Sequence, residues 1–141
     1  MKKFVIPLLF VAANAQATDW QHLCLAKTIY WEARGESIRG QYAVASTVLN
    51  RVKSKKHPNT ICKVVYQRNQ FSWTHIHKKH RISEPLAWQV AKVVAKAAIE
   101  GLVPDLTHGA TYYHADYVRP SWRKKFQKTV KIGKHIFYKT K

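Results

Sequence analysis

Acidic residues are scarce in this chain, whose 141 residues hold 7 Asp and Glu against 25 Lys and Arg, for a formal net charge of +18. Because the carboxylates are so few, each one can be considered in turn as a catalytic group. Cysteine occurs only twice, and without a CxxC pair the sequence does not indicate a zinc ribbon. Internal repeats, low-complexity tracts and Gly/Ser-rich linkers are also lacking. These absences indicate one modest folded domain.

Apolar runs long enough to cross a membrane are missing as well. The most apolar segment, Phe4 to Ala13, follows two lysines and precedes the small-residue tripeptide Ala15–Ala17, which is the order of a secretory signal peptide. Ten residues rising about 1.5 Å each cannot cross a hydrocarbon layer of ~30 Å. We therefore expect residues 1–17 to be a signal peptide and residues 18–141 to be a single exported domain, with a retained anchor as the alternative.

Positive charge is a property of the expected mature domain. Removing residues 1–17 takes away two of the 25 basic residues and no acid, which leaves +16. Seventeen aromatic residues favour a packed core over a disordered basic tail. A nucleic-acid-binding protein would show the same charge, but the export signal argues against that class. A membrane-disordering cationic protein would need a long basic amphipathic helix, and Leu86 to Ile99 carries only two lysines.

The two cysteines, Cys24 and Cys62, are expected to form a disulfide, because exported domains meet oxidising conditions. Two buried free thiols are the alternative.

The spacing of apolar residues predicts helices first and strands last. Helices are expected over residues 19–33 with Asp19 as N-cap, 41–54, 58–65 and 83–100. Strands are expected over 110–118 and 130–138, the second turning as a hairpin at Gly133 and Lys134. The fold class is therefore α+β, mainly helical, with a small C-terminal antiparallel sheet.

Among the seven acids, Glu32 is the strongest candidate for chemistry. Four others have ordinary roles at helix ends or turns: Asp19, Glu84, Glu100 and Asp105. Glu32 lies beside Tyr30 and Trp31, near the C-terminal end of the first helix. The aromatic neighbours and the negative end of the helix dipole both raise the pKa of a carboxyl group toward that of a general acid. Arg34 would act in the opposite direction if it reached the carboxylate. A partly buried helix carboxylate paired with arginine is the alternative.

Several separated motifs resemble the SleB/CwlJ-type cell wall hydrolase family. The resemblance runs through AKTIYWEARGESIRGQYAVASTVLNRV from Ala26 and through residues 58–73. It returns in GATYYHADYVRPSW from Gly109 and in IGKHIFY from Ile132. The EARGE segment, Glu32 to Glu36, is the most specific part.

The resemblance implies a peptidoglycan-cleaving domain with a lysozyme-like or lytic-transglycosylase-like architecture, in which Glu32 is the catalytic acid and base. The implied reaction cleaves the MurNAc–GlcNAc β-1,4 bond with a 1,6-anhydro product. A transglycosylase needs one carboxylate, because the C6 hydroxyl of the same sugar replaces water. If Glu36 or Asp116 supplied a second carboxylate at the cleft, a muramidase-type hydrolase would be the better interpretation.

Substrate contacts are expected from four residues in the matched motifs. Gln70 can bond sugar acetamides, and Phe71 can stack on a pyranose face or belong to the core. The side chains of Tyr113 and His114 end in polar groups. Asn50 and Arg51 are expected to tie the second helix to its neighbours.

No metal site or cofactor is expected. The stretch HIHKKH, with His75, His77 and His80, has neither HExxH nor CxxC spacing. The expected partners are peptidoglycan strands and, through the basic surface, the polyanionic cell envelope, but not nucleic acid. We expect a monomer that is periplasmic or secreted to the cell wall.

Overall fold

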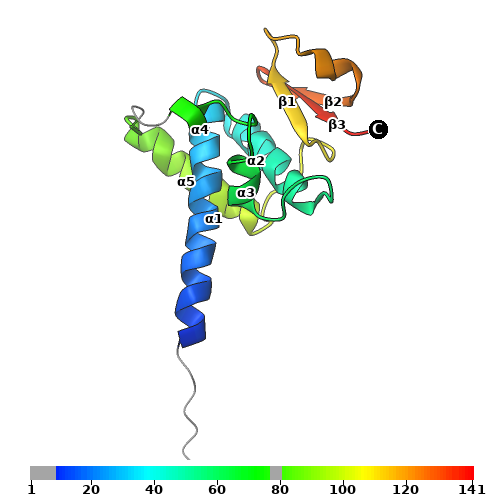
Figure 1. Cartoon of the computed structure of the whole chain (residues 1–141). Helices are drawn as coiled ribbons and strands as arrows, with labels where there is room; N and C mark the ends of the chain where they lie inside the picture. Colours follow the sequence, from blue (N-terminus) through cyan, green and yellow to red (C-terminus); the bar gives the residue numbers. More distant parts are fainter. Residues whose placement is uncertain (1–8, 77–80) are drawn as a thin grey trace, which may run out of the picture.

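Helices come first along the chain and strands last, as Figure 1 shows. The computed structural model describes residues 9–76 and 81–141. Its helices are α1 (Leu9–Ala33), α2 (Ile38–Lys53), α3 (Ile61–Val65), α4 (Trp73–Ile76) and α5 (Pro85–Ile99). Its strands are β1 (Tyr112–Ala115), β2 (Gln127–Ile132) and β3 (His135–Lys139), with a 3₁₀ turn, η1 (Ser121–Lys124), between the first two. The expected fold class is confirmed.

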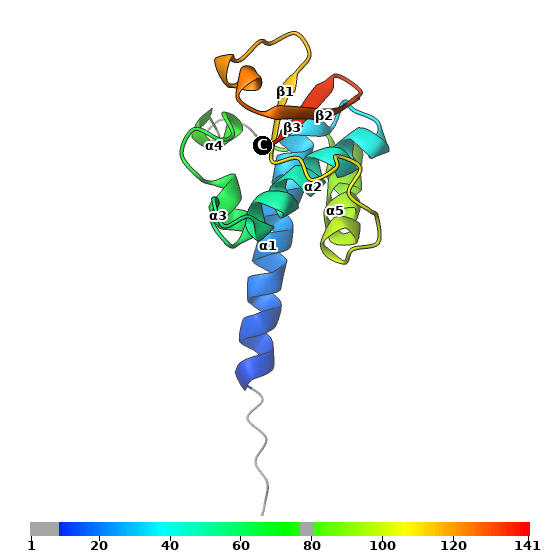
Figure 2. The same cartoon turned by 90° about the vertical axis from the view of Figure 1, so that its right-hand side faces the viewer.

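The first helix is longer than the sequence pattern predicts. It begins at Leu9, so the prediction of Asp19 as an N-cap is wrong: Asp19 lies inside α1. Leu, Ala and Gln are good helix formers, and they carry the helix through the expected signal segment. The N-terminal part of α1 extends away from the rest of the molecule (Figures 1 and 2). Within the described residues, no helix is both long and apolar enough to span a membrane.

Local capping fixes the remaining helices close to their expected bounds. The Ser37 hydroxyl accepts a hydrogen bond from the backbone N–H of Gly40 and caps α2, and Thr60 caps α3 in the same way through Lys63. Helix α5 starts with Pro85 and is followed by Gly101 at φ +71°. The short α4 and η1 were not expected from the sequence pattern.

The helical core forms where α1 packs against α2, α3 and α5. Leu25 and Ile29 of α1 and Val48 of α2 are fully buried there, with Val64 of α3. A disulfide joins Cys24 of α1 to Cys62 of α3 and confirms the expected pairing.

The three strands form an antiparallel sheet in the order β1-β3-β2. Strands β2 and β3 are joined by the expected hairpin turn, in which Gly133 adopts φ +56°, a value that favours glycine. A second apolar cluster attaches the sheet to α2, made of Ala43, Ala110, Ile132 and Phe137. Tyr113 of β1 packs against both this cluster and the helical core. The sheet therefore lies over one end of the helical body (Figure 2).

Candidate active site

Glu32 lies in the last turn of α1, where the helical body meets the sheet. The Tyr113 hydroxyl of β1 donates a hydrogen bond of 2.7 Å to its Oε2 atom. The bond joins residues 81 positions apart in the chain. It depends on the fold, because α1 and β1 belong to different layers of the molecule.

A cavity of about 410 Å³ opens beside this carboxylate. It takes its walls from the end of α1, from α2, from the loop between α3 and α4, and from the sheet with the segment that follows β1. Its lining consists of Trp31, Glu32, Arg51, Gln70, Phe71, Tyr113, His114, Ala115, Tyr117, Val118, Pro120, Trp122 and His135. The expected acid and all four expected contact residues are thus brought together in one cavity.

Burial raises the pKa of the Glu32 carboxyl group above its ordinary value. The hydrogen bond from Tyr113 and the charge of Arg51 lower that pKa, but by less. Arg34, which would lower this pKa if it reached the carboxylate, pairs with Glu84 and lies over the Tyr30 ring. The net direction favours a protonated carboxyl group at pH values where an exposed Glu is ionised.

Arg51 is the cation of the cavity, a role that the sequence did not reveal. Its side chain is 4% exposed, its Nε donates a 2.6 Å hydrogen bond to the Thr111 carbonyl, and its guanidinium lies 5.6 Å from the Phe71 ring and 5.3 Å from the Tyr112 ring. Its buried Nη1 has no hydrogen-bond partner among the described residues. The expected tie between α2 and its neighbours is confirmed, but the same side chain also faces the cavity.

Gln70 and Phe71 reach the cavity from a turn shaped by Asn69. That residue adopts φ +61°, which asparagine tolerates better than most side chains. Phe71 is 3% exposed and belongs to the helical core, which is one of its two expected roles, and it also lines the cavity.

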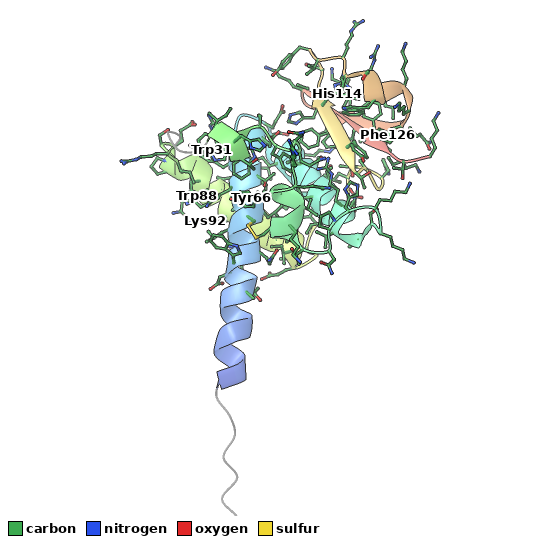
Figure 3. The ribbon with its side chains drawn as sticks, viewed as in Figure 1. Trp31, Tyr66, Trp88, Lys92, His114 and Phe126 are labelled. Atoms are coloured by element: carbon green, nitrogen blue, oxygen red, sulfur yellow. A yellow bond between two sulfur atoms is a disulfide. The ribbon has the colours of Figure 1, made fainter. Side chains whose placement is uncertain are left out.

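His114 is fixed on the sheet (Figure 3). Its Nε2 lies 2.8 Å from the Tyr138 hydroxyl, and its Nδ1 lies 2.7 Å from the Ala115 carbonyl. Its ring also stacks on that of Tyr138 at 5.3 Å between centroids. The imidazole therefore forms a rigid part of the cavity wall.

The two candidate second carboxylates contact the sheet instead. Glu36 accepts a 3.3 Å hydrogen bond from the backbone N–H of Lys134, and Asp116 lies 3.2 Å from the Lys131 Nζ. Among the described residues, neither contributes to the lining of the cavity.

The segment between β1 and η1 supplies cavity residues that the sequence analysis missed. Tyr117 is 83% exposed and Val118 is 45% exposed, and both stand at the cavity with Trp122. His135 of β3 also lines the cavity, with its ring 5.0 Å from that of Tyr113. The match of GATYYHADYVRPSW already indicated this segment but not which of its side chains would face the cavity.

Within residues 9–76 and 81–141, no three His, Cys, Asp or Glu side chains are grouped so as to hold a metal ion. His75 is exposed at α4, whereas His77 and His80 lie outside the described residues.

Comparison with known proteins identifies the family of this chain. The family model for the cell wall hydrolases matches residues 35–138, most of the chain. The chain belongs to the cell wall hydrolase family. Its relatives in this family include the spore cortex-lytic enzyme of Bacillus cereus, 37% identical over 118 residues, and that of Bacillus subtilis, 31% identical over 113. The alignments cover 82% and 80% of this chain but only 42% and 35% of those enzymes, so the chain spans about two fifths of the length of these relatives or less.

Two solved structures of cell wall hydrolase domains share the fold. One is the catalytic domain of the germination-specific lytic transglycosylase SleB from Bacillus anthracis, with a TM-score of 0.72 and 34% identity, covering 84% of this chain and 93% of that domain. The other is the catalytic domain of the Bacillus cereus SleB protein, with a TM-score of 0.71 and 35% identity, covering 84% and 89%. The chain thus corresponds to nearly the whole of a catalytic domain, and the resemblance noted in the sequence is confirmed.

Proposed function

We propose that this chain cleaves peptidoglycan glycan strands at the MurNAc–GlcNAc β-1,4 bond as a lytic transglycosylase, with Glu32 as acid and then as base. One observation carries the proposal: among the described residues, Glu32 is the only carboxylate that lines the cavity. A muramidase with two carboxylates needs the second one within about 5–9.5 Å of the first, across the scissile bond. Glu36 and Asp116 bind the sheet instead, which favours the mechanism with one carboxylate.

In the first step, protonated Glu32 donates its proton to the bridging oxygen as the C1–O bond breaks. Because the Tyr113 hydroxyl bonds Oε2, we assign the transferable proton to Oε1. Burial raises the pKa of Glu32, which favours the protonated form that this step needs. Once the proton has left, the hydrogen bond from Tyr113 and the charge of Arg51 stabilise the carboxylate.

In the second step, the Glu32 carboxylate takes the proton of the C6 hydroxyl as that oxygen attacks C1 of the same sugar. The new C6–O–C1 bond gives the 1,6-anhydro product and restores the protonated acid. Intramolecular attack makes a bound water or an enzyme nucleophile unnecessary. Glu32 thus begins and ends the cycle in the same protonation state.

Glycan binding is assigned to the other walls of the cavity. The Gln70 amide can bond an acetamide group, and the exposed ring of Tyr117 and the half-buried ring of Trp122 offer faces on which a pyranose can stack. His114 offers an imidazole fixed by its bonds on the sheet.

We also propose that residues 1–17 direct export, that residues 18–141 form the mature domain, and that it acts at the cell wall as a monomer. The order of charged, apolar and small residues in the first 17 positions supports export. A peptidoglycan substrate is consistent with that location.

The test is digestion of purified sacculi by the wild type and by Glu32→Gln. We expect mass spectrometry of the wild-type digest to show anhydromuramyl ends. Glu32→Gln should remain folded and bound to the wall but lose activity by at least about 10³-fold, because it removes the acid and the base of one reaction.

Other products would identify other chemistry. Reducing muramyl ends would indicate a hydrolase, and freed peptide stems would indicate cleavage outside the glycan. If Glu32→Gln digested the sacculi at nearly the wild-type rate, Glu32 would not be the catalytic residue.

A further inference from the structure

We propose that Glu36, the second acid of the EARGE segment, is a positioning residue that fastens the β2–β3 turn to the end of α1 and thereby holds Tyr113 against Glu32. The inference rests on the proposed function of Glu32. It assigns Glu36 a role different from that of a second catalytic carboxylate.

The contacts of Glu36 show how closely the turn is held. Its Oε1 accepts the backbone N–H of Lys134 at 3.3 Å, and its side chain is only 15% exposed. A Cβ atom placed on Gly133 would overlap Oε2 and lie 3.1 Å from Cδ. The carboxylate therefore occupies the space that a side chain at position 133 would need, and the hairpin backbone rests directly on it.

A continuous set of contacts leads from this turn to the reacting group. His135 follows the turn, and its Nδ1 lies 4.0 Å from Oε1 of Glu36. The His135 ring packs on the Tyr113 ring at 5.0 Å, and the Tyr113 hydroxyl bonds Glu32. Glu36 and Glu32 flank the end of α1, so the same short segment carries the acid and fastens the strands that orient it.

The chemistry of the contact indicates an acceptor oxygen, not a charge. Burial lowers the pKa of His135 despite the opposing charges of Glu36 and Asp116, so its ring is favoured in the neutral form. The hydrogen bond from Lys134 N–H needs only an oxygen, which glutamine also provides. A catalytic carboxylate could not be replaced by an amide in this way.

The experiment compares Glu36→Gln with Glu36→Ala in steady-state cleavage of soluble glycan strands, at a temperature where circular dichroism shows each variant folded. We expect Glu36→Gln to stay within about threefold of the wild-type kcat, because the acceptor oxygen remains. Glu36→Ala should lose about 10- to 100-fold in kcat, the size of effect that a small misplacement of a catalytic group produces. Its KM should stay within about twofold of the wild-type value, since Gln70 and Tyr117 lie on other segments.

Two results would overturn the proposal. Equal inactivity of both variants would make Glu36 a catalytic carboxylate, and wild-type kcat in Glu36→Ala would show that the contact positions nothing. The wild type is assayed alongside: absence of anhydromuramyl product there would refute the proposed function itself and not the role of Glu36.

Gly133→Ala tests the same contact from the hairpin and replaces Glu36→Ala if that variant fails to fold. We expect it to lower kcat while the protein stays folded. Gly101→Ala is the matched control, because Gly101 also has a positive φ, +71°, but no neighbouring atom lies within 4 Å of the place that the added methyl group would take. Wild-type kcat in Gly133→Ala, or equal losses in both glycine variants, would contradict the proposal.

Discussion

At the scale of single residues, opposing influences act on the pKa of the carboxyl group that lines the cavity. Burial of Glu32 disfavours the charge, while Tyr113 and Arg51 favour it. Burial favours the form that can donate a proton, and the other two influences favour the carboxylate that remains after the donation. The opposing influences suit a group that must act as acid and then as base.

Removing the Tyr113 hydroxyl should upset this balance in a known direction. The hydrogen bond from Tyr113 lowers the pKa of Glu32, so Tyr113→Phe should raise that pKa. The proposed acid step needs protonated Glu32 and is lost as pH rises through its pKa, so the alkaline limb of the kcat profile should move to higher pH. We also expect about a tenfold lower kcat at the optimum, because a hydrogen bond of about 1.5 kcal/mol to the carboxylate is lost.

Tyr112→Phe is the control for this measurement. The Tyr112 ring stacks on Phe126 and lies near Arg51, and the phenylalanine would keep both contacts. Its pH profile should match that of the wild type. A Tyr113→Phe profile that stays in place or moves to lower pH would contradict the account of Glu32.

The sequence predicts five of the 13 residues that line the cavity, although all 13 lie within the matched motifs. The five are Glu32, Gln70, Phe71, Tyr113 and His114. Arg51 was assigned only a structural role because a helix pattern shows that a side chain points inward, not which cavity its free atoms face. Arg34 would oppose the raised pKa only if it reached the Glu32 carboxylate, but the chain turns after Ala33 and Arg34 pairs with Glu84.

At the scale of elements, the disulfide fixes α3 to the middle of α1. Cys24 precedes Glu32 by eight positions, about 12 Å along a helix. The bond therefore braces the helix that carries the acid without reaching the cavity. Apolar spacing predicted the helices that face the core, but it missed α4 and η1, which contain four residues each and are too short to show a period.

Replacing both cysteines by serine should lower the free energy of unfolding by about 4 kcal/mol, because the 38-residue separation is no longer closed in the unfolded chain. Urea denaturation of the two proteins would measure this difference. The kcat of the folded variant should stay within about twofold of the wild-type value.

A reductant provides the control, since it should destabilise the wild type and leave Cys24→Ser/Cys62→Ser unchanged. Equal stability of the two proteins without reductant would show that the bond contributes nothing measurable.

At the scale of the whole molecule, positive charge is concentrated around the sheet. From position 117 to the end of the sequence there are nine Lys and Arg residues and no acid. Most are exposed, among them Lys124, Lys125 and Lys128. Since the same segment contributes cavity residues, a polyanionic envelope attracted to this surface would lie next to the cavity.

Changing Lys124, Lys125 and Lys128 together to glutamine should weaken retention on anionic cell walls by roughly 1 kcal/mol per lysine, and added salt should reduce the difference. Co-sedimentation with purified walls at increasing NaCl would measure it. Turnover of soluble, uncharged glycan fragments should not change, because none of the three lines the cavity.

The matched control changes Lys53, Lys55 and Lys56, another basic run, to glutamine. We expect this variant to lose less retention than the first. Equal losses would mean that net charge alone, and not the surface around the sheet, holds the protein on the wall.

The unbroken course of α1 from Leu9 to Ala33 has a consequence for the proposed removal of residues 1–17. Cleavage after Ala17 would divide a helix, not a linker, and would create a new amino end at Thr18. Asp19 would then stand in the opening turn, where its negative charge offsets the unpaired N–H groups. Removal of residues 1–17 would thus allow Asp19 to stabilise the start of the helix, which it does not do while those residues are present.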